Sequence, residues 1–408
     1  MAVHALKLLL LFALVNLSLE LDNGLARSPP MGWSSWNHFH RSINETLFYE
    51  TVDAMISSGL AEVGYQYINF DGGWWEGHDT GHAVRNSSGF LQYDKMRFPK
   101  GMKALADYIH SKGLRFGHYT DAGKHFCNRD APASEGYEKQ DVAQFASWEI
   151  DMLKLDACGT TEDPKVIVGR WHELLNSTGR FILFSNCHNG CMLEKGRSQW
   201  ESWCGNLTNM WRTSTDIGDS WLRVMHNLDT LVGAGMQAKP GQWNDPDFLE
   251  VGNGMLTEGE MRAHFSLWCV TSSPLIAGND IRNMSKEVLE VLTNRDAIAI
   301  NQAYTTNAGD RIFQSGNSEI WAKPLPELSA IAGAKAFGVV LLNRDDEKTA
   351  EITVNFTALN MTSATHCTVK DLWSKKQMDA KGSITMSVPS HDVTFLRLSL
   401  CVKTGDNE

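Results

Sequence analysis

Two aspartates, each placed after a short apolar or aromatic run, are the residues of this chain best suited to chemistry. The segment Met152-Leu-Lys-Leu-Asp-Ala-Cys158 is typical of a buried strand that ends in the carboxylate of Asp156. Further along, Arg212-Thr-Ser-Thr-Asp216 supplies a second carboxylate four positions after an arginine. Two carboxylates at one mouth could cleave a glycosidic bond, one attacking the anomeric carbon and the other protonating the departing oxygen. An aspartate after a strand can also be a helix cap, so the flanking sequence must decide.

A repeated strand and helix pattern has to position these acids. Apolar runs at 65–71, 114–120, 152–156 and 181–185 predict strands, and helical spacing at 102–112, 142–148 and 165–175 predicts helices between them. This alternation favours parallel strands joined by right-handed crossovers. Polar side chains follow each strand in turn, at Asn69 and Asp71, Tyr119 and Asp121, Lys154 and Asp156, and Asn186 and His188. Chemistry gathered at the carboxyl ends of successive parallel strands favours a (β/α)8 barrel over an open sheet.

The pattern changes after Tyr304, where short alternating runs are separated by turn residues. Such runs predict an antiparallel β-sandwich. We therefore expect a signal peptide at 1–21, a catalytic barrel at 22–304, a β-domain at 305–402 and a disordered tail at 403–408.

The N-terminus and the cysteines indicate an exported protein. A basic start precedes an apolar stretch at 8–19, which is too short for a membrane span and has the length of a secretion signal. Beyond it lie seven N-x-S/T sequons and eight cysteines, which fit glycosylation and disulfide formation. The net charge of −11 argues against nucleic acid or an anionic membrane as partner. We expect secretion or a lysosomal or vacuolar location, with a homodimer possible.

Six motifs occur in one order along the first three quarters of the chain. They are Pro30-Met-Gly-Trp-Ser-Ser-Trp-Asn-His-Phe39, Asn69-Phe-Asp-Gly-Gly-Trp74, Tyr119-Thr-Asp-Ala-Gly123, Lys154-Leu-Asp-Ala-Cys158, Trp211-Arg-Thr-Ser-Thr-Asp-Ile217 and Trp243-Asn-Asp-Pro-Asp-Phe-Leu249. In this order they resemble the α-galactosidase and α-N-acetylgalactosaminidase family of retaining glycoside hydrolases. The resemblance runs from about Leu25 to Gln302, and the C-terminal domain matches only in general character.

The resemblance implies a barrel followed by an antiparallel β-domain, with Asp156 as nucleophile and Asp216 as acid/base. Lys154 shares a strand face with Asp156, so its ammonium should help keep the nucleophile ionised. Asp216 has to hold a proton, so we expect partial burial to raise its pKa. The family's sugar-binding residues that recur here are Trp36, Asp71, Tyr119, Lys154, Arg212 and Asp247. The resemblance also implies a disulfide between Cys127 and Cys158.

The chain departs from the family at several positions around the sugar. Gly72 stands where relatives carry a second aspartate that grips the C4–C6 edge, so we expect open space beside C6. Cys187-His188-Asn189 replaces a Cys-Glu-Trp segment near C2, which makes His188 and Asn189 candidate binding residues. His118 replaces an aliphatic residue and Phe248 a methionine. Arg41 and Gly73 replace two family cysteines, so one family disulfide is lost as a unit.

These observations favour release of terminal α-D-galactose and leave alternatives open. An isomalto-dextranase-like enzyme would use a sugar substituted at O6, a β-L-arabinopyranosidase would use a pentose, and a more remote alternative is an inactive carbohydrate-binding relative. The histidines are scattered without metal-ligand spacing, and nucleotide-binding fingerprints do not occur. We therefore expect a carbohydrate substrate, without metal or cofactor.

Overall fold

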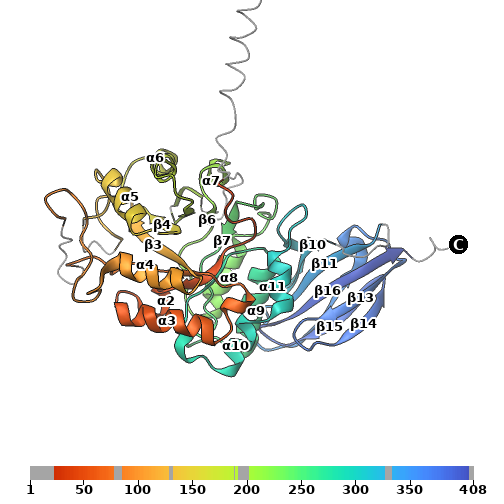
Figure 1. Ribbon diagram of the computed structural model, residues 1–408. Coiled ribbons are helices and arrows are strands. Elements are labelled where there is room, and N and C mark those ends of the chain that lie inside the picture. The colour runs from red at the N-terminus through yellow and green to blue at the C-terminus, as the bar shows by residue number, and fades with distance from the viewer. Residues whose placement is uncertain are drawn as a thin grey trace, which may run out of the picture.

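Eight parallel strands form the first part of the computed structural model, which describes residues 23–77, 85–127, 132–187, 189–191, 202–326 and 333–403. Their order in the sheet is β7-β6-β5-β4-β3-β2-β1-β8. The strands are β1 (Met31–Ser34), β2 (Tyr67–Asn69), β3 (Arg115–Asp121), β4 (Met152–Asp156), β5 (Leu183–Asn186), β6 (Met210–Arg212), β7 (Trp243–Asp245) and β8 (Leu275–Ala277). Figure 1 shows them surrounded by helices.

The sheet closes on itself. Strand β1 pairs with both β2 and β8, and a parallel bridge from Leu249, just after β7, to Ala277 joins the two ends of the order. Almost every strand residue is buried, because helices cover the outer face of the sheet and side chains fill its interior. Since all eight strands run the same way, their carboxyl ends meet at one rim. The predicted barrel is confirmed.

Helices between the strands begin with strong local signals. Asp163 caps α6 and is followed by Pro164 at the first helical position. Thr257 and Glu260 form a capping box at the start of α9. The helices are α2 (Trp36–Phe39), α3 (Glu45–Ser57), α4 (Gly101–Ser111), α5 (Glu138–Ser147), α6 (Pro164–Ser177), α7 (Trp203–Leu207), α8 (Trp221–Asp229), α9 (Glu258–Val270), α10 (Lys286–Leu292) and α11 (Arg295–Gln302). Short 3-10 turns are Ala61–Val63, Asn189–Cys191, Ile281–Asn283 and Phe356–Leu359.

The second part of the chain is an antiparallel β-domain of two sheets. A six-stranded sheet has the order β14-β13-β16-β11-β10-β9, and β12 pairs with β15 in a second sheet. The strands are β9 (Asp310–Ser315), β10 (Ser318–Leu325), β11 (Lys335–Asn343), β12 (Ala350–Asn355), β13 (Thr365–Asp371), β14 (Gln377–Lys381), β15 (Ser383–Val388) and β16 (Asp392–Lys403). A core that includes Val354, Val369 and Leu398 lies between the sheets. The sequence did not predict β14, because its side chains are half-buried or exposed and show no apolar alternation.

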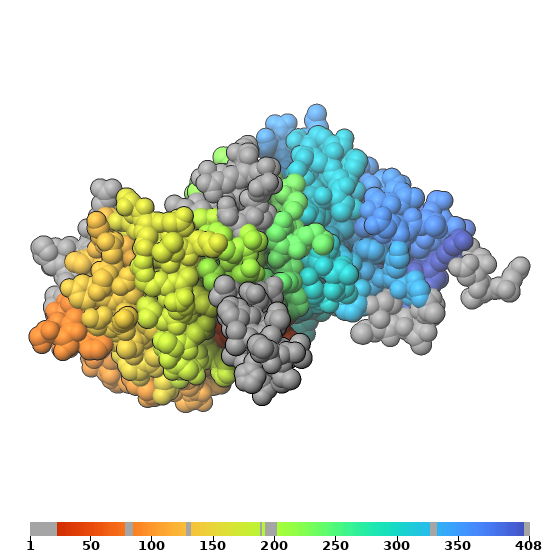
Figure 2. Space-filling view, turned by 90° about the horizontal axis from the view of Figure 1, so that it is seen from above, coloured from red at the N-terminus to blue at the C-terminus, as the bar shows by residue number. Residues whose placement is uncertain are grey.

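The barrel and the β-domain share a core. Helix α9 is buried along almost its whole length because it lies against β10, β11 and β16. Figures 1 and 2 show the blue C-terminal domain directly against the green and cyan part of the barrel. Arg344 bridges Asp229 of α8 and the fully buried Glu319 of β10, at 2.7 and 3.0 Å. Among the described helices, none has the length and apolar character to cross a membrane.

Candidate active site

A cavity of about 300 Å³ opens at the rim where the carboxyl ends of the barrel strands meet. Its walls come from the segments that end or follow β1 to β7, so residues up to 212 positions apart in sequence share one space. The lining residues are Trp36, Asn37, Asp71, Gly72, Trp75, Tyr119, Phe126, Cys127, Lys154, Asp156, Cys158, Cys187, Arg212, Ser214, Thr215, Asp216, Asp247 and Phe248. The cavity therefore contains both aspartates singled out from the sequence.

Asp156 ends β4 at the floor of the cavity. Its Oδ2 accepts a hydrogen bond from Tyr119 Oη at 3.2 Å, and its Oδ1 accepts one from the backbone N–H of Ala157 at 3.1 Å. Burial raises the pKa of Asp156, while the Lys154 ammonium opposes this rise. Two donors thus fix the carboxylate in place, and a nearby positive charge favours its ionised form.

Lys154 lies two residues before Asp156, on the same face of β4. Its Nζ contacts Asp71 Oδ2 at 2.7 Å, and both side chains are largely buried. Burial lowers the pKa of Lys154, but the carboxylates around it, Asp71 foremost, outweigh burial and raise it. The ammonium is therefore permanently charged, and it acts on Asp156 through space while it is hydrogen-bonded to Asp71.

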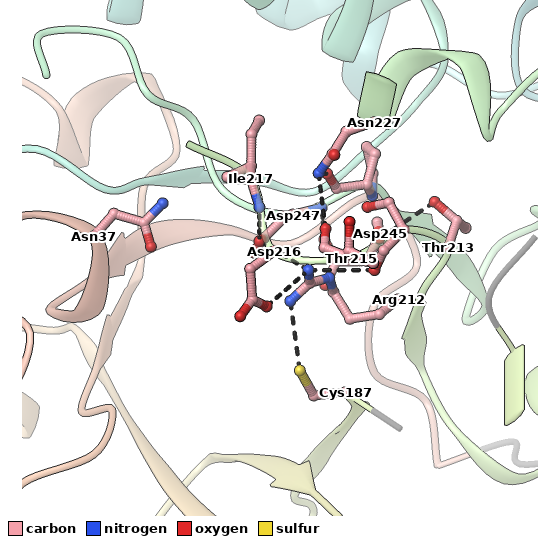
Figure 3. Close-up of polar contacts among 12 residues, drawn as sticks. Asn37, Cys187, Arg212, Thr213, Thr215, Asp216, Ile217, Asn227, Asp245 and Asp247 are labelled. Atoms are coloured by element: carbon pink, nitrogen blue, oxygen red, sulfur yellow. Dashed lines mark hydrogen bonds and ion pairs between the residues drawn. The ribbon is translucent and has the colours of Figure 1, made fainter. Parts of the chain in front are cut away.

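Asp216 stands on the open side of the cavity, with 80% of its side chain exposed. Figure 3 shows its carboxylate beside the Arg212 guanidinium, whose Nη2 lies 3.2 Å from Asp216 Oδ1. Burial raises the pKa of Asp216, but the positive charges of Arg212, Lys154 and Arg223 together hold it below its usual range. The expectation of a raised pKa is therefore wrong for the free protein, because three cations outweigh the partial burial.

Arg212 is held by a second, fully enclosed carboxylate. Its Nη2 lies 2.8 Å from Asp247 Oδ2, and the same oxygen accepts the backbone N–H of Ile217 at 2.8 Å. Asp247 has a φ of +83°, a conformation that non-glycine residues seldom adopt. The surrounding contacts, which include Trp268 Nε1 on its backbone carbonyl at 2.9 Å, hold it in that conformation. Asp247 thus fixes both the arginine and the loop that carries Asp216.

One wall of the cavity is aromatic. Trp75 and Phe126 stack with ring centres 3.6 Å apart, next to Trp36 and Tyr119. A Cβ added at Gly72 would lie 3.2 Å from the Trp36 ring and 3.4 Å from the Trp75 ring. Two indole rings therefore narrow the room directly beside Gly72, which itself lines the cavity.

Most residues predicted for the site come together in this cavity. Trp36, Asp71, Gly72, Tyr119, Lys154, Arg212 and Asp247 all line it with the two acids. His188 lies outside the described residues, and of Asn189 only the backbone is described. His118 is buried beneath the site among aromatic rings, where burial lowers its pKa to about 3. The sequence analysis did not select Asn37, Trp75 or Phe126, although Asn37 lies inside the first motif, Trp75 follows the second and Phe126 precedes Cys127.

Three disulfides join the described cysteines. Cys127 pairs with Cys158 beside the cavity, Cys191 with Cys204, and Cys367 with Cys401, whereas Cys187 and Cys269 are thiols. Asp121, Asp156, Cys127 and Cys158 bring four potential metal ligands together. The disulfide removes both thiolates from that set, so the group does not form a thiolate metal site.

Comparison with known proteins agrees with this geometry. A family model described as alpha galactosidase A matches residues 28–303, and one described as the alpha galactosidase C-terminal beta sandwich domain matches residues 315–398. Alpha-galactosidase 2 of Arabidopsis thaliana is 42% identical over 368 residues, or 88% of each chain. The chain belongs to the alpha-galactosidase family of retaining glycoside hydrolases. It is therefore an enzyme, and the alternative of an inactive carbohydrate-binding relative is dropped.

Other members of the alpha-galactosidase family show the same relationship. An alpha-galactosidase of Oryza sativa is 40% identical over 374 residues, which is 91% of this chain and 84% of that protein. The crystal structure of alpha-galactosidase I from Mortierella vinacea superposes with a TM-score of 0.81 at 32% identity, covering 92% of this chain and 98% of that one. A β-L-arabinopyranosidase from Geobacillus stearothermophilus, 21% identical with a TM-score of 0.77, shares the fold.

Proposed function

We propose that this enzyme releases terminal α-D-galactose from glycosides with retention of anomeric configuration. The observation that carries the proposal is the pair Asp156 and Asp216 in one cavity, with different environments. Asp156 is half-buried, hydrogen-bonded and close to the Lys154 ammonium. Asp216 is exposed at the mouth, where a leaving group would depart. This difference suits a nucleophile and an acid/base respectively.

The proposed reaction has two displacements. In the first, an Asp156 oxygen bonds to the anomeric carbon while the glycosidic bond breaks, and the Asp216 proton goes to the departing oxygen. In the second, Asp216 takes a proton from water, the water oxygen bonds to the anomeric carbon, and Asp156 leaves as a carboxylate. The two inversions give net retention.

Asp216 has to gain a proton before the first step, although cations lower its pKa in the free protein. A sugar seated over Asp216 would exclude water from an exposed carboxylate, and loss of hydration raises a carboxyl pKa. Binding of the substrate would thus shift Asp216 toward the protonated form. Once Asp156 is esterified, its negative charge disappears and Asp216 can act as a base.

The polar and aromatic groups around these acids would bind the sugar. We propose that they hold the hydroxyls and the ring face of one sugar, the set being Trp36, Asp71, Gly72, Tyr119, Lys154, His188, Asn189, Arg212 and Asp247. Buried charged groups such as Asp71 and Lys154 form strong hydrogen bonds with hydroxyls in a site of low dielectric.

The two indole rings beside Gly72 favour a second candidate substrate. The family resemblance directs this position toward C6, and the two indoles near it are apolar. A β-L-arabinopyranoside has the ring of galactose without the hydroxymethyl group, so an apolar wall would suit it. An O6-substituted glucan end is less favoured, because the Trp36 and Trp75 rings narrow the space beside Gly72.

A substrate panel tests these proposals. The enzyme should be assayed on aryl α-D-galactoside, β-L-arabinopyranoside, α-D-glucoside and an isomaltose-type substrate, with the first product anomer followed by proton NMR. We expect the highest kcat/KM on the α-galactoside, with α-galactose as the first product. A higher kcat/KM on the arabinoside would transfer the proposal to the second candidate, and an inverted product would refute the two-displacement mechanism.

The N-terminal segment and the disulfides bear on the cellular location of the enzyme. We propose that residues 1–21 direct export, that 22–304 and 305–402 form the barrel and the β-domain, and that 403–408 are a tail. Three disulfides support passage through an oxidising compartment, which is consistent with secretion or a lysosomal or vacuolar location. A homodimer is possible, and the molecular mass in solution would test it.

A further inference from the structure

Asn37 lines the cavity at its open side, opposite the strands that carry the two acids. It follows β1 within the short helix α2 and is half-buried. Figure 3 shows its carboxamide directed toward the space beside the Asp216 carboxylate. Asn37, Asp216, Asp156 and Lys154 all line the same cavity. Asn37 is therefore directed toward the side of the cavity that carries the proposed proton donor.

A buried carboxylate fixes the orientation of this carboxamide. Asn37 Nδ2 donates a hydrogen bond to Oε1 of Glu250, which is only 3% exposed. Glu250 Oε2 accepts from Asn253 Nδ2 at 2.5 Å, and the Glu250 backbone N–H donates to His264 Nε2 at 3.0 Å. While Glu250 is ionised it can only accept hydrogen bonds, so the amide nitrogen of Asn37 then faces Glu250.

The remaining polar atom of Asn37 faces the cavity. None of the described residues donates a hydrogen bond to Asn37 Oδ1. Gly278, after β8, lies close behind Asn37, since a Cβ at Gly278 would be 3.2 Å from Asn37 Cβ. The carboxamide is thus backed by the β8 loop and anchored by the β7 loop, and it presents a single acceptor to the space next to Asp216.

We propose that Asn37 Oδ1 accepts a hydrogen bond from a hydroxyl of the leaving-group sugar, and that Glu250 positions the carboxamide for it. The proposal rests on the proposed function, in which Asp216 protonates the departing oxygen. A group that flanks this proton donor at the mouth contacts what departs and not the sugar that stays on Asp156. The chemical class that it recognises is a hydroxylated leaving group, as in a disaccharide or an oligosaccharide.

The test compares two substrates that share a galactosyl group and differ in what leaves. 4-Nitrophenyl α-D-galactoside has a leaving group with no hydroxyl donor, whereas an α-1,6-galactosyl-glucose disaccharide has a hydroxylated one. We expect Asn37→Ala to lower kcat/KM on the disaccharide by about tenfold, the usual effect of one lost sugar hydrogen bond. The same variant should keep kcat/KM on the aryl galactoside within about twofold.

Two further variants separate recognition from structural support. Glu250→Gln should raise KM for the disaccharide and leave kcat on the aryl galactoside unchanged, because a side-chain amide at position 250 can no longer force the Asn37 nitrogen toward it. Asn283→Ala removes the carboxamide of an exposed asparagine that does not line the cavity, and it should leave both substrates unaffected. Asn37→Ser keeps a short acceptor and should recover part of the loss.

The outcomes distinguish this proposal from the proposed function. Equal losses on both substrates in Asn37→Ala, or equal losses in Glu250→Gln, would overturn the leaving-group role and indicate structural support. Unchanged activity on both substrates would overturn it as well. Absence of wild-type activity on either galactoside would instead refute the proposed galactosidase function. Melting temperatures identify a variant that does not fold, in which case Asn37→Ser decides.

Discussion

Lys154 Nζ contacts Asp71 Oδ2 at 2.7 Å, although Asp156 lies only two residues away on the same strand face. The ammonium therefore neutralises the Asp71 carboxylate directly and influences Asp156, the proposed nucleophile, through space. Asp71 and Lys154 act on Asp156 in opposite directions, since the first raises the pKa of Asp156 and the second lowers it. The pair sets the charge balance around the nucleophile.

This balance predicts opposite shifts of the pH profile in two variants. Asp71→Asn removes a negative charge near Asp156, so the pKa of Asp156 should fall and the acid limb of kcat/KM should move to lower pH. Lys154→Met removes the positive charge, so the acid limb should move to higher pH. Both variants should also lose activity. The profiles should be measured on a reactive aryl galactoside. The prediction would be contradicted if the acid limb moved in the same direction in both variants.

The two aspartates should respond differently to removal of their charge. Asp156→Asn should abolish turnover on every substrate, because the covalent bond cannot form. Asp216→Asn should slow substrates with poor leaving groups most, because good ones depart without protonation. The measurement is kcat/KM over a series of aryl galactosides with leaving groups of different acidity. Residual activity of Asp156→Asn above about one per cent would refute its role as nucleophile.

The activity of the wild type should peak on the acid side of neutrality, at roughly pH 4–6. Catalysis needs Asp156 ionised and Asp216 protonated. Burial raises the pKa of Asp156, whereas Arg212 and its neighbouring cations outweigh burial at Asp216 and lower its pKa. Because the two carboxylates interact, the bell-shaped curve reports apparent pKa values that belong to the pair. A curve of kcat/KM centred near pH 8 would be inconsistent with this pair.

Substitution at Gly72 separates steric from polar effects. Gly72→Ala should lower kcat/KM on aryl α-galactoside several-fold, because its Cβ presses on Trp36 at 3.2 Å. Gly72→Asp carries the same steric cost and adds a carboxylate that can bind a sugar hydroxyl. We expect Gly72→Asp to exceed Gly72→Ala on α-galactoside by roughly 10–100-fold, with preference moving away from the arabinoside. Identical values for the two variants would show that the carboxylate contributes nothing there.

The stability of the β-domain should depend on Glu319, which lies behind the arginines that contact α8. This fully buried carboxylate accepts hydrogen bonds from Arg311 at 2.8 Å, Arg344 at 3.0 Å and Trp321 Nε1 at 2.9 Å. Glu319→Ala leaves two guanidinium groups without a buried partner and should lower the free energy of unfolding by about 3–5 kcal/mol. Asp229→Ala is the control, because that aspartate is 43% exposed and should cost less than about 1 kcal/mol. Thermal denaturation that ranks the two variants equally would contradict the prediction.

The sequence by itself determined the architecture and singled out Asp156 and Asp216 as the candidate reacting acids. Apolar runs alternating with helical spacing require parallel strands, and parallel strands bring their carboxyl ends to one rim. Asp156 and Asp216 follow two such strands, so their meeting could be predicted from local patterns and from the family motifs. The edge strand β14 was missed because its exposed side chains lack the apolar alternation that indicates a strand.

Only the tertiary structure decided how the groups around these acids behave. The lowered pKa of Asp216 depends not only on the nearby Arg212 but also on Lys154 of β4, which is 62 positions away in sequence. The narrow space beside Gly72 depends on the ring of Trp36, which is 36 positions away in sequence. The orientation of Asn37 depends on Glu250, which is 213 positions away. Electrostatic and packing effects depend on distances in space, and sequence patterns describe only neighbours along the chain.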